Sequence, residues 1–174
     1  VALLAHGLER GDAGAALDFA FEPAADPKKD ALTRAIVVVH KGKIIAERYA
    51  PGFGPDTLQY GASMSKSVTS ALTGLRVRDG ALSLNATGIL PEWKKPDDPR
   101  SKITLDHLLR MSSGLEYVDG YAWQQDGSKL LFQSADMGGF AASKPLEFPI
   151  DTQFKYSDGT TNIISKIIRN SFQG

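Results

Sequence analysis

Ser63 and Lys66 stand three residues apart in the run Ser63-Met64-Ser65-Lys66, a spacing that suits a serine nucleophile and its base. On a helix, side chains three positions apart lie on the same face, so the hydroxyl and the amine would lie one turn apart near the helix N-terminus. A Ser hydroxyl reacts only when a neighbouring group takes its proton. A Lys can do so only when burial or nearby positive charge lowers its pKa well below the ordinary value of about 10.4. The pattern therefore favours nucleophilic catalysis with Ser63 as nucleophile and Lys66 as base.

The S-x-x-K spacing by itself is weak, because 14 Ser and 12 Lys in 174 residues predict about one such pair by chance. The surroundings of the motif give it weight. It follows a predicted hairpin and the aromatic-glycine step Tyr60-Gly61, and it opens the most regular apolar helix of the chain.

Two other schemes fit the same residues less well. The run Gly61-Ala62-Ser63-Met64-Ser65 resembles a nucleophile elbow, G-x-S-x-G, but has Ser in place of the final Gly. The run Ser65-Lys66-Ser67 resembles the end of a phosphate-binding loop, but Tyr60 and Ser65 stand where that loop needs Gly. We therefore expect neither an elbow nor a phosphate-binding loop.

A second polar segment, over residues 154–162, contains Tyr156 and Asp158. Taken alone, a Tyr in such a loop is usually a packing residue, and an Asp-Gly pair is usually a turn that caps a helix. Together with Ser63 and Lys66, Tyr156 adds a third group able to relay a proton, because a nearby ammonium stabilises a phenolate.

The elements that must position these residues are a hairpin and several helices. An Ala-rich, weakly helical lead-in over residues 1–32 precedes the main part, 33–174. The β-branched run 35–40, the turn Lys41-Gly42 and the run 43–49 predict a hairpin. Apolar residues at helical spacing predict four helices. The first begins after Tyr60-Gly61 and stops at Asp79-Gly80, and the second runs from the N-cap Thr104 to Met111. The last two cover about 135–142 and 160–170.

The composition predicts a soluble globular protein whose partners are small molecules or proteins. Twenty Lys and Arg balance 20 Asp and Glu without a block of like charge, which argues against nucleic-acid binding. No apolar run approaches the roughly 18 to 20 residues of a membrane span. With no Cys, three scattered His and no H-E-x-x-H motif, neither a metal nor a disulfide is expected. No signal peptide is recognised, and cytoplasmic and periplasmic locations both stay open.

Three separated stretches carry a family resemblance. The run from Tyr60 to Thr69 holds S-x-x-K, residues 103–115 form a helix pattern that ends in Ser113-Gly114-Leu115, and Tyr156-Ser157-Asp158 follows. In this order they resemble the nucleophile helix, the helix ending in Ser-Gly-Leu and the Tyr-x-Asn motif of the serine β-lactamase-related family. That family includes class C β-lactamases, D-alanyl-D-alanine peptidases, family VIII carboxylesterases and 6-aminohexanoate-dimer hydrolases. The resemblance covers about residues 33–170 and implies an α/β fold of the penicillin-recognising (β-lactamase/transpeptidase-like) kind, with a sheet and a helical region.

The resemblance also implies roles for individual residues. Ser63 would be the acylated nucleophile, Lys66 its proton acceptor, and Tyr156 the group that passes the proton to the leaving group. The backbone N–H of Ser63 would form half of the oxyanion hole. Asp158 and Ser65 are candidates for binding substrate or for supporting these groups. No cofactor is implied.

The sequence departs from the family pattern in two ways. Asp158 stands where many members have Asn, and its charge would alter both the pKa of Lys66 and the substrate preference. The forms Tyr-Ser-Asp-Gly-Thr-Thr-Asn and Ser-Met-Ser-Lys-Ser are closer to the 6-aminohexanoate-dimer hydrolase and esterase branch.

The second departure is that the Lys/His-x-Gly type of motif of the family's later strands is absent. We therefore expect residues 33–174 to be the N-terminal and helical part of the domain. A second chain could supply the missing strands.

Two functions follow as hypotheses. The first is a serine hydrolase that acts through an acyl-enzyme on an ester or amide bond of a small acyl compound. The second is a binding or scaffold protein that keeps the fold without catalysis, which the absent later motif would favour.

Overall fold

The structure, a computed structural model of the chain, describes residues 3–4, 10–95 and 97–172. Its contacts divide the chain into two compact units, Val1–Tyr60 and Gly61–Gly174. The predicted border at residues 32 and 33, between a lead-in segment and the main part, lies within the first unit and stays a prediction.

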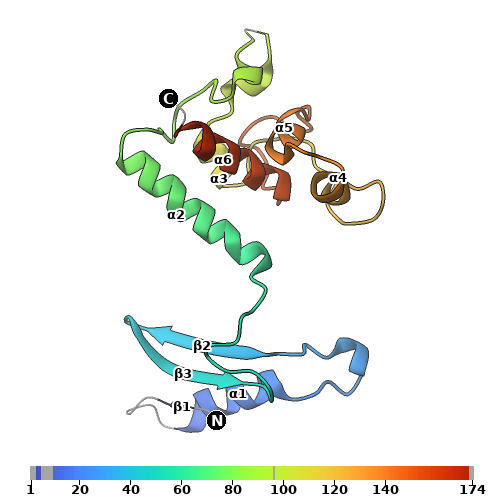
Figure 1. Cartoon of the computed structure of the whole chain (residues 1–174). Coiled ribbons are helices and arrows are strands. Elements are labelled where there is room, and N and C mark those ends of the chain that lie inside the picture. Colours follow the sequence, from blue (N-terminus) through green and yellow to red (C-terminus); the bar gives the residue numbers. More distant parts are fainter. Residues whose placement is uncertain (1–2, 5–9, 96, 173–174) are drawn as a thin grey trace. The chain divides into compact units, whose positions relative to one another are not determined.

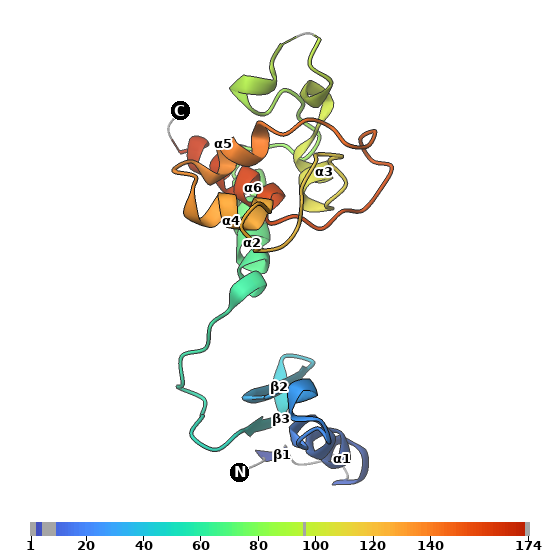
Figure 2. The same cartoon turned by 90° about the vertical axis from the view of Figure 1, so that its right-hand side faces the viewer.

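In its described residues, the first unit has a three-stranded antiparallel sheet, one α-helix and the 3-10 turn Pro27–Lys29 (Figures 1 and 2). The strand order is β1-β3-β2, and the elements are β1 Leu3–Leu4, α1 Arg10–Phe21, β2 Ala35–His40 and β3 Lys43–Tyr49. The pairing of β2 with β3 confirms the predicted hairpin. Lys41 and Gly42 both have positive φ, 47° and 74°, as a two-residue turn between twisted strands requires.

The second unit is mostly helical. Its α-helices are α2 Ser65–Arg78, α3 Leu105–Leu109, α4 Asp126–Phe132, α5 Met137–Ala142 and α6 Asp158–Asn170, and its 3-10 turns include Ala62–Met64, Pro91–Trp93 and Pro99–Lys102. None of the helices in the described ranges is long and apolar enough to cross a lipid bilayer.

Four of these helices confirm predicted ones, with shifted ends. Thr104 caps α3 as expected, its hydroxyl accepting from the backbone N–H of His107 at 3.2 Å. The last helix begins earlier than predicted because Ser157 caps it and accepts from the N–H of Thr160 at 3.1 Å. The sequence did not predict α4, which has seven residues and carries the weak helix former Gly127 in its first turn.

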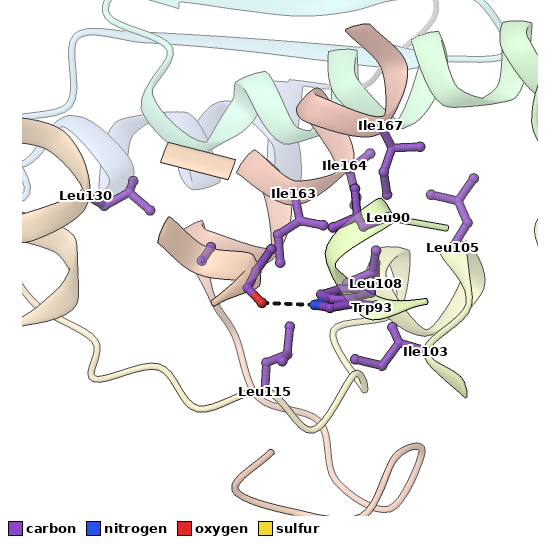
Figure 3. Packing of buried hydrophobic residues seen from close by; sticks show 12 residues of the cluster. Leu90, Trp93, Ile103, Leu105, Leu108, Leu115, Leu130, Ile163, Ile164 and Ile167 are labelled. Carbon is purple, nitrogen blue, oxygen red and sulfur yellow. Dashed lines mark hydrogen bonds between the residues drawn. The ribbon is translucent and has the colours of Figure 1, made fainter. Parts of the chain in front are cut away.

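The core of the second unit gathers apolar side chains around Trp93 (Figure 3). Trp93 is fully buried, and its indole N–H donates to the carbonyl of Ala142 at 2.9 Å, which satisfies the polar atom of this large side chain. The last helix contributes Ile163, Ile164 and Ile167, whose spacing places them on one face. The other buried members are Leu90, Ile103, Leu105, Leu108, Leu115, Leu130, Ala141 and Ala142.

Polar contacts at both ends fix α2 beside α6. At the C-terminal ends, the Arg76 guanidinium donates to the hydroxyl of Ser171 at 2.9 Å and to its carbonyl at 2.6 Å. At the N-terminal ends, Lys66 pairs with Asp158. The two helices therefore run in the same direction, and their N-termini meet at the polar residues that the sequence singled out.

Candidate active site

Ser63 lies in the 3-10 turn Ala62–Met64 that leads directly into α2. Its side chain is exposed. Ala62, the residue before it, has a φ of +41°, a region that residues with a Cβ rarely occupy. Such local strain is found at functional sites, where the surrounding structure holds an unfavourable conformation in place. The turn therefore presents the Ser63 hydroxyl at the surface, at the start of the helix.

Two groups lie within hydrogen-bond distance of the Ser63 hydroxyl. The Lys66 amine is 3.0 Å from Ser63 Oγ, and the Tyr156 hydroxyl is 2.7 Å from the same atom. Lys66 reaches it from the first turn of α2, whereas Tyr156 comes from the segment that precedes α6. The structure thus brings together the three residues expected to react, in the arrangement that a nucleophile and its proton-transfer groups need.

Asp158 completes this cluster from the first turn of α6. Its Oδ1 lies 2.5 Å from the Lys66 amine, and its Oδ2 accepts from the Tyr121 hydroxyl at 2.8 Å. The Lys66 and Asp158 side chains are each 20% exposed, so water screens their attraction less than at an open surface. A carboxylate near the positive end of α6 is also favoured by the helix dipole.

The ion pair changes the pKa values of both partners. Burial acts to lower the pKa of Lys66, but the hydrogen bonds with Asp158 and Tyr156 outweigh it, so the pKa lies above its ordinary value. Burial likewise acts to raise the pKa of Asp158, but the hydrogen bonds from Lys66 and Tyr121 hold it below its ordinary value. A Lys66 that acts as a base was expected to have a pKa below the ordinary value, whereas its pKa is raised.

Tyr121 belongs to this cluster, and sequence reasoning missed it. Its hydrogen bond to Asp158 raises its pKa, because a phenolate could not donate to the carboxylate. The loop that carries it is held by the start of α4: the Ser128 hydroxyl donates to the carbonyl of Tyr121 at 2.6 Å, and Asp126 accepts from the N–H of Val118 at 2.8 Å. The sequence of α4 has no clear helical pattern, and the one local signal near Tyr121 is the turn pair Asp119-Gly120. In the structure Gly120 has a φ of +113°, a conformation that favours glycine.

The remaining candidates lie elsewhere or have local roles. The Ser65 hydroxyl donates to the carbonyl of Ala62 at 2.8 Å, so it supports the turn that carries the nucleophile. His107 takes part in the cap of α3, its ring nitrogen accepting from the N–H of Thr104 at 3.2 Å. His40 ends β2 in the first unit, and His6 lies outside the described residues. Within the part of the chain that the structure describes, no three His, Asp or Glu side chains gather as metal ligands.

Comparisons with known proteins show the family and the fold. The family model described as Beta-lactamase matches residues 17–174. A solved structure titled "Putative 6-aminohexanoate-dimer hydrolase from Bacillus anthracis" superposes with a TM-score of 0.64 and 24% sequence identity, over 82% of this chain and 41% of that chain. At this identity the likeness shows a common fold, and the chain spans less than half the length of that structure. No curated protein matches the sequence.

Proposed function

The chain belongs to the β-lactamase family, and from this premise and the geometry of the Ser63 cluster we propose that it is a serine hydrolase or the nucleophile-bearing part of one. The fold is β-lactamase-like, with helices and a small antiparallel sheet, as the sequence predicted. The proposed reaction cleaves an ester or amide bond of a small acyl compound through an acyl-enzyme at Ser63.

One observation carries the proposal: the Ser63 hydroxyl has both an amine and a phenol within hydrogen-bond distance, 3.0 Å and 2.7 Å away. A hydroxyl with these neighbours can lose its proton as it attacks a carbonyl carbon. A binding or scaffold protein has no need of such an arrangement around an exposed Ser. The ion pair of Lys66 with Asp158 holds the Lys66 amine in a fixed position beside the reacting atoms.

The proposed chemistry has two halves. Ser63 Oγ attacks the carbonyl carbon as its proton passes to the Lys66 and Tyr156 pair, and the proton then goes to the leaving group as the acyl-enzyme forms. Water repeats the sequence in reverse and releases the acid. The N–H of Ser63, at the positive end of α2, serves as one donor to the developing oxyanion.

Esters and linear amides are the proposed substrate class. The family match supports hydrolysis of an acyl bond in general, and the name of the similar solved structure supports a linear amide as one substrate to test.

Covalent labelling with a fluorophosphonate, read by mass spectrometry of the full protein, tests this proposal. We expect one added phosphonyl group on the wild type and none on the Ser63→Ala variant. Ser67→Ala is the matched control, because this exposed Ser lies four residues away, inside α2, and has no role in the turn that carries Ser63; it should keep the label. A label retained in Ser63→Ala, or none on the wild type, would reject the assignment. Turnover of p-nitrophenyl esters, β-lactams and linear amides then separates the substrate classes.

A further inference from the structure

We propose that three buried residues at the start of α4, the segment Asp126–Ser128, position the Ser63 site by holding Tyr121 in place. Tyr121 in turn holds Asp158. The three residues are positioning residues, because they act on the site through Tyr121. This inference rests on the proposed function and deepens it, since it adds a fourth segment to the three motifs on which the reaction depends.

Asp126 closes the loop that carries Tyr121. One oxygen of its carboxylate accepts from the N–H of Val118 at 2.8 Å, and its own N–H donates to the carbonyl of Val118 at 3.0 Å. The other oxygen lies 2.7 Å from the amine of Lys144, which follows the end of α5. Asp126 is 1% exposed, so water cannot compete for these bonds, and losing one of them would leave a buried polar group unpaired. The two ends of the loop 118–126 are therefore held together.

Gly127 lets the ring of Tyr121 lie against the start of α4. A Cβ at position 127 would overlap the backbone oxygen of Gly120 and lie 3.1 Å from two ring carbons of Tyr121. Backbone atoms cannot move aside as the end of a flexible side chain can, so an added methyl group would displace the loop. A glycine inside a helix is otherwise unfavourable by about 1 kcal/mol relative to alanine. The close approach of Tyr121 is a physical reason for a glycine at this position.

Ser128 completes the hold on Tyr121. Its hydroxyl donates to the carbonyl of Tyr121 at 2.6 Å. The Tyr121 side chain itself is 61% exposed, and its hydroxyl donates to Asp158 Oδ2 at 2.8 Å. An exposed side chain of this kind would populate several rotamers unless its backbone and one face of its ring were fixed. The segment at the start of α4 supplies both restraints, so it sets the direction of the Tyr121 hydroxyl.

Tyr121 decides which oxygen of Asp158 faces Lys66. With Oδ2 bonded to Tyr121, Oδ1 lies 2.5 Å from the Lys66 amine, and that amine lies 3.0 Å from Ser63 Oγ. The terminal torsion of an aspartate is broad, so without the Tyr121 hydroxyl the carboxylate would turn more freely and the amine would lose its fixed partner. A misplacement of about 1 Å at a reacting group can slow a reaction by about 100-fold. The start of α4 is thus connected to the nucleophile through Tyr121 and Asp158.

Gly127→Ala tests this connection through the rate at which a fluorophosphonate labels Ser63 in the full protein. The rate should fall by about tenfold or more, because the added methyl group displaces Tyr121. Tyr121→Phe should lower it by about 10- to 100-fold, which corresponds to the loss of one hydrogen bond to a charged group. Gly74→Ala is the matched control, because it is the same substitution inside α2 with nothing within 4 Å of the added Cβ. It should be labelled at the wild-type rate.

A double variant separates positioning from a general weakening of the fold. In the Tyr121→Phe background, Gly127→Ala should change the labelling rate by less than about twofold, because the hydroxyl through which it acts is gone. Ser128→Ala removes one hydrogen bond without adding volume, so it serves in the same comparison if Gly127→Ala does not fold. Its expected loss is about threefold or more in the wild-type background. Equal losses in both backgrounds, or no loss in either single variant, would overturn the proposal.

An NMR titration of the full protein with ¹³Cζ-labelled tyrosine tests the position of Tyr121 without catalysis. Tyr121→Phe assigns the Tyr121 resonance among the five tyrosines. In the wild type this resonance should titrate above the ordinary value of about 10. The reason is that the hydrogen bond with Asp158 and the charges of Asp158 and Asp119 raise the pKa of Tyr121 more than Lys66 lowers it.

The variants should divide into two groups in this titration. Gly127→Ala should lower the pKa of Tyr121 toward about 10, as Asp158→Asn does, whereas Gly74→Ala should leave it unchanged. The titration stands even if fluorophosphonate labelling rejects Ser63 as the nucleophile, so the two proposals can fail separately. An unchanged Tyr121 titration in both Gly127→Ala and Ser128→Ala would overturn the proposal.

Discussion

The Tyr156 hydroxyl lies 2.7 Å from Ser63 Oγ, although 93 positions separate the two residues in the chain. The contact depends on α2 and α6 lying side by side, with the Arg76 contacts to Ser171 at one end and the ion pair of Lys66 with Asp158 at the other. A change that disturbs this pair of helices should therefore affect the site as well as the fold.

Tyr156→Phe should abolish most of the acylation while the protein stays folded, because the side chain is 41% exposed and only its hydroxyl reaches Ser63. Tyr117→Phe is the matched control. The Tyr117 hydroxyl is buried and has no hydrogen-bond partner among the described residues, so its removal should leave stability equal or higher and acylation intact. Rates of fluorophosphonate labelling and urea unfolding of both variants measure these effects. Equal labelling losses in the two variants would contradict the role of Tyr156.

The pH dependence of stability should show the ion pair of Lys66 with Asp158. The folded pKa of Asp158 is depressed, so its contribution is present above the unfolded value of about 3.9 and is lost as the pH falls through the lower folded value. The folded pKa of Lys66 is raised, so its contribution is present below about 10.4 and is lost as the pH rises through the higher folded value. The free energies of unfolding of wild type and Asp158→Asn, measured with urea, should therefore differ most between about pH 3.9 and pH 10.4. A difference that does not shrink in acid would contradict the pairing.

Asp126→Ala should lower the free energy of unfolding by about 1 to 3 kcal/mol, because it leaves the N–H of Val118 without its acceptor and leaves Lys144 with only the more distant Glu116, 3.7 Å away. Asp126 is 1% exposed, lies 2.7 Å from the Lys144 amine and accepts from the N–H of Val118. Lys129→Ala is the control: this Lys is more exposed and lies 3.9 Å from the same carboxylate, so its loss should cost less than about 1 kcal/mol. Urea unfolding measures both, and similar values would show that Asp126 is not held as described.

Gly114→Ala should destabilise the protein by about 2 kcal/mol or more, because this position in the Ser-Ser-Gly-Leu segment requires a glycine. Gly114 has a φ of +77°, and a Cβ there would lie 2.4 Å from the backbone oxygen of Phe148. Gly74→Ala should instead stabilise it by about 0.5 to 1 kcal/mol, because Gly74 lies inside α2 with nothing within 4 Å of an added Cβ. Thermal unfolding of the two variants should shift in opposite directions, and a stabilising Gly114→Ala would contradict the close approach at Phe148.

The sequence was informative where a signal is local. The turn Lys41-Gly42 needs two positive φ values, and the Thr104 cap needs one hydroxyl, so both could be predicted from neighbouring residues. The spacing of Ser63 and Lys66 likewise indicated that the two side chains share one face of a helix start. The family and the fold class followed from the order of three such local motifs, and the comparisons confirm both.

Only the tertiary structure decided the electrostatic state of the site. The charge of Asp158 was visible in the sequence, but its 2.5 Å distance from the Lys66 amine depends on the packing of α2 against α6. The membership of Tyr121 depends on α4, a seven-residue helix whose position is set by the buried Asp126 rather than by a periodic pattern. A pKa depends on charges and burial within a few ångströms in space, and residues 92 positions apart in the chain reach that distance only through the fold.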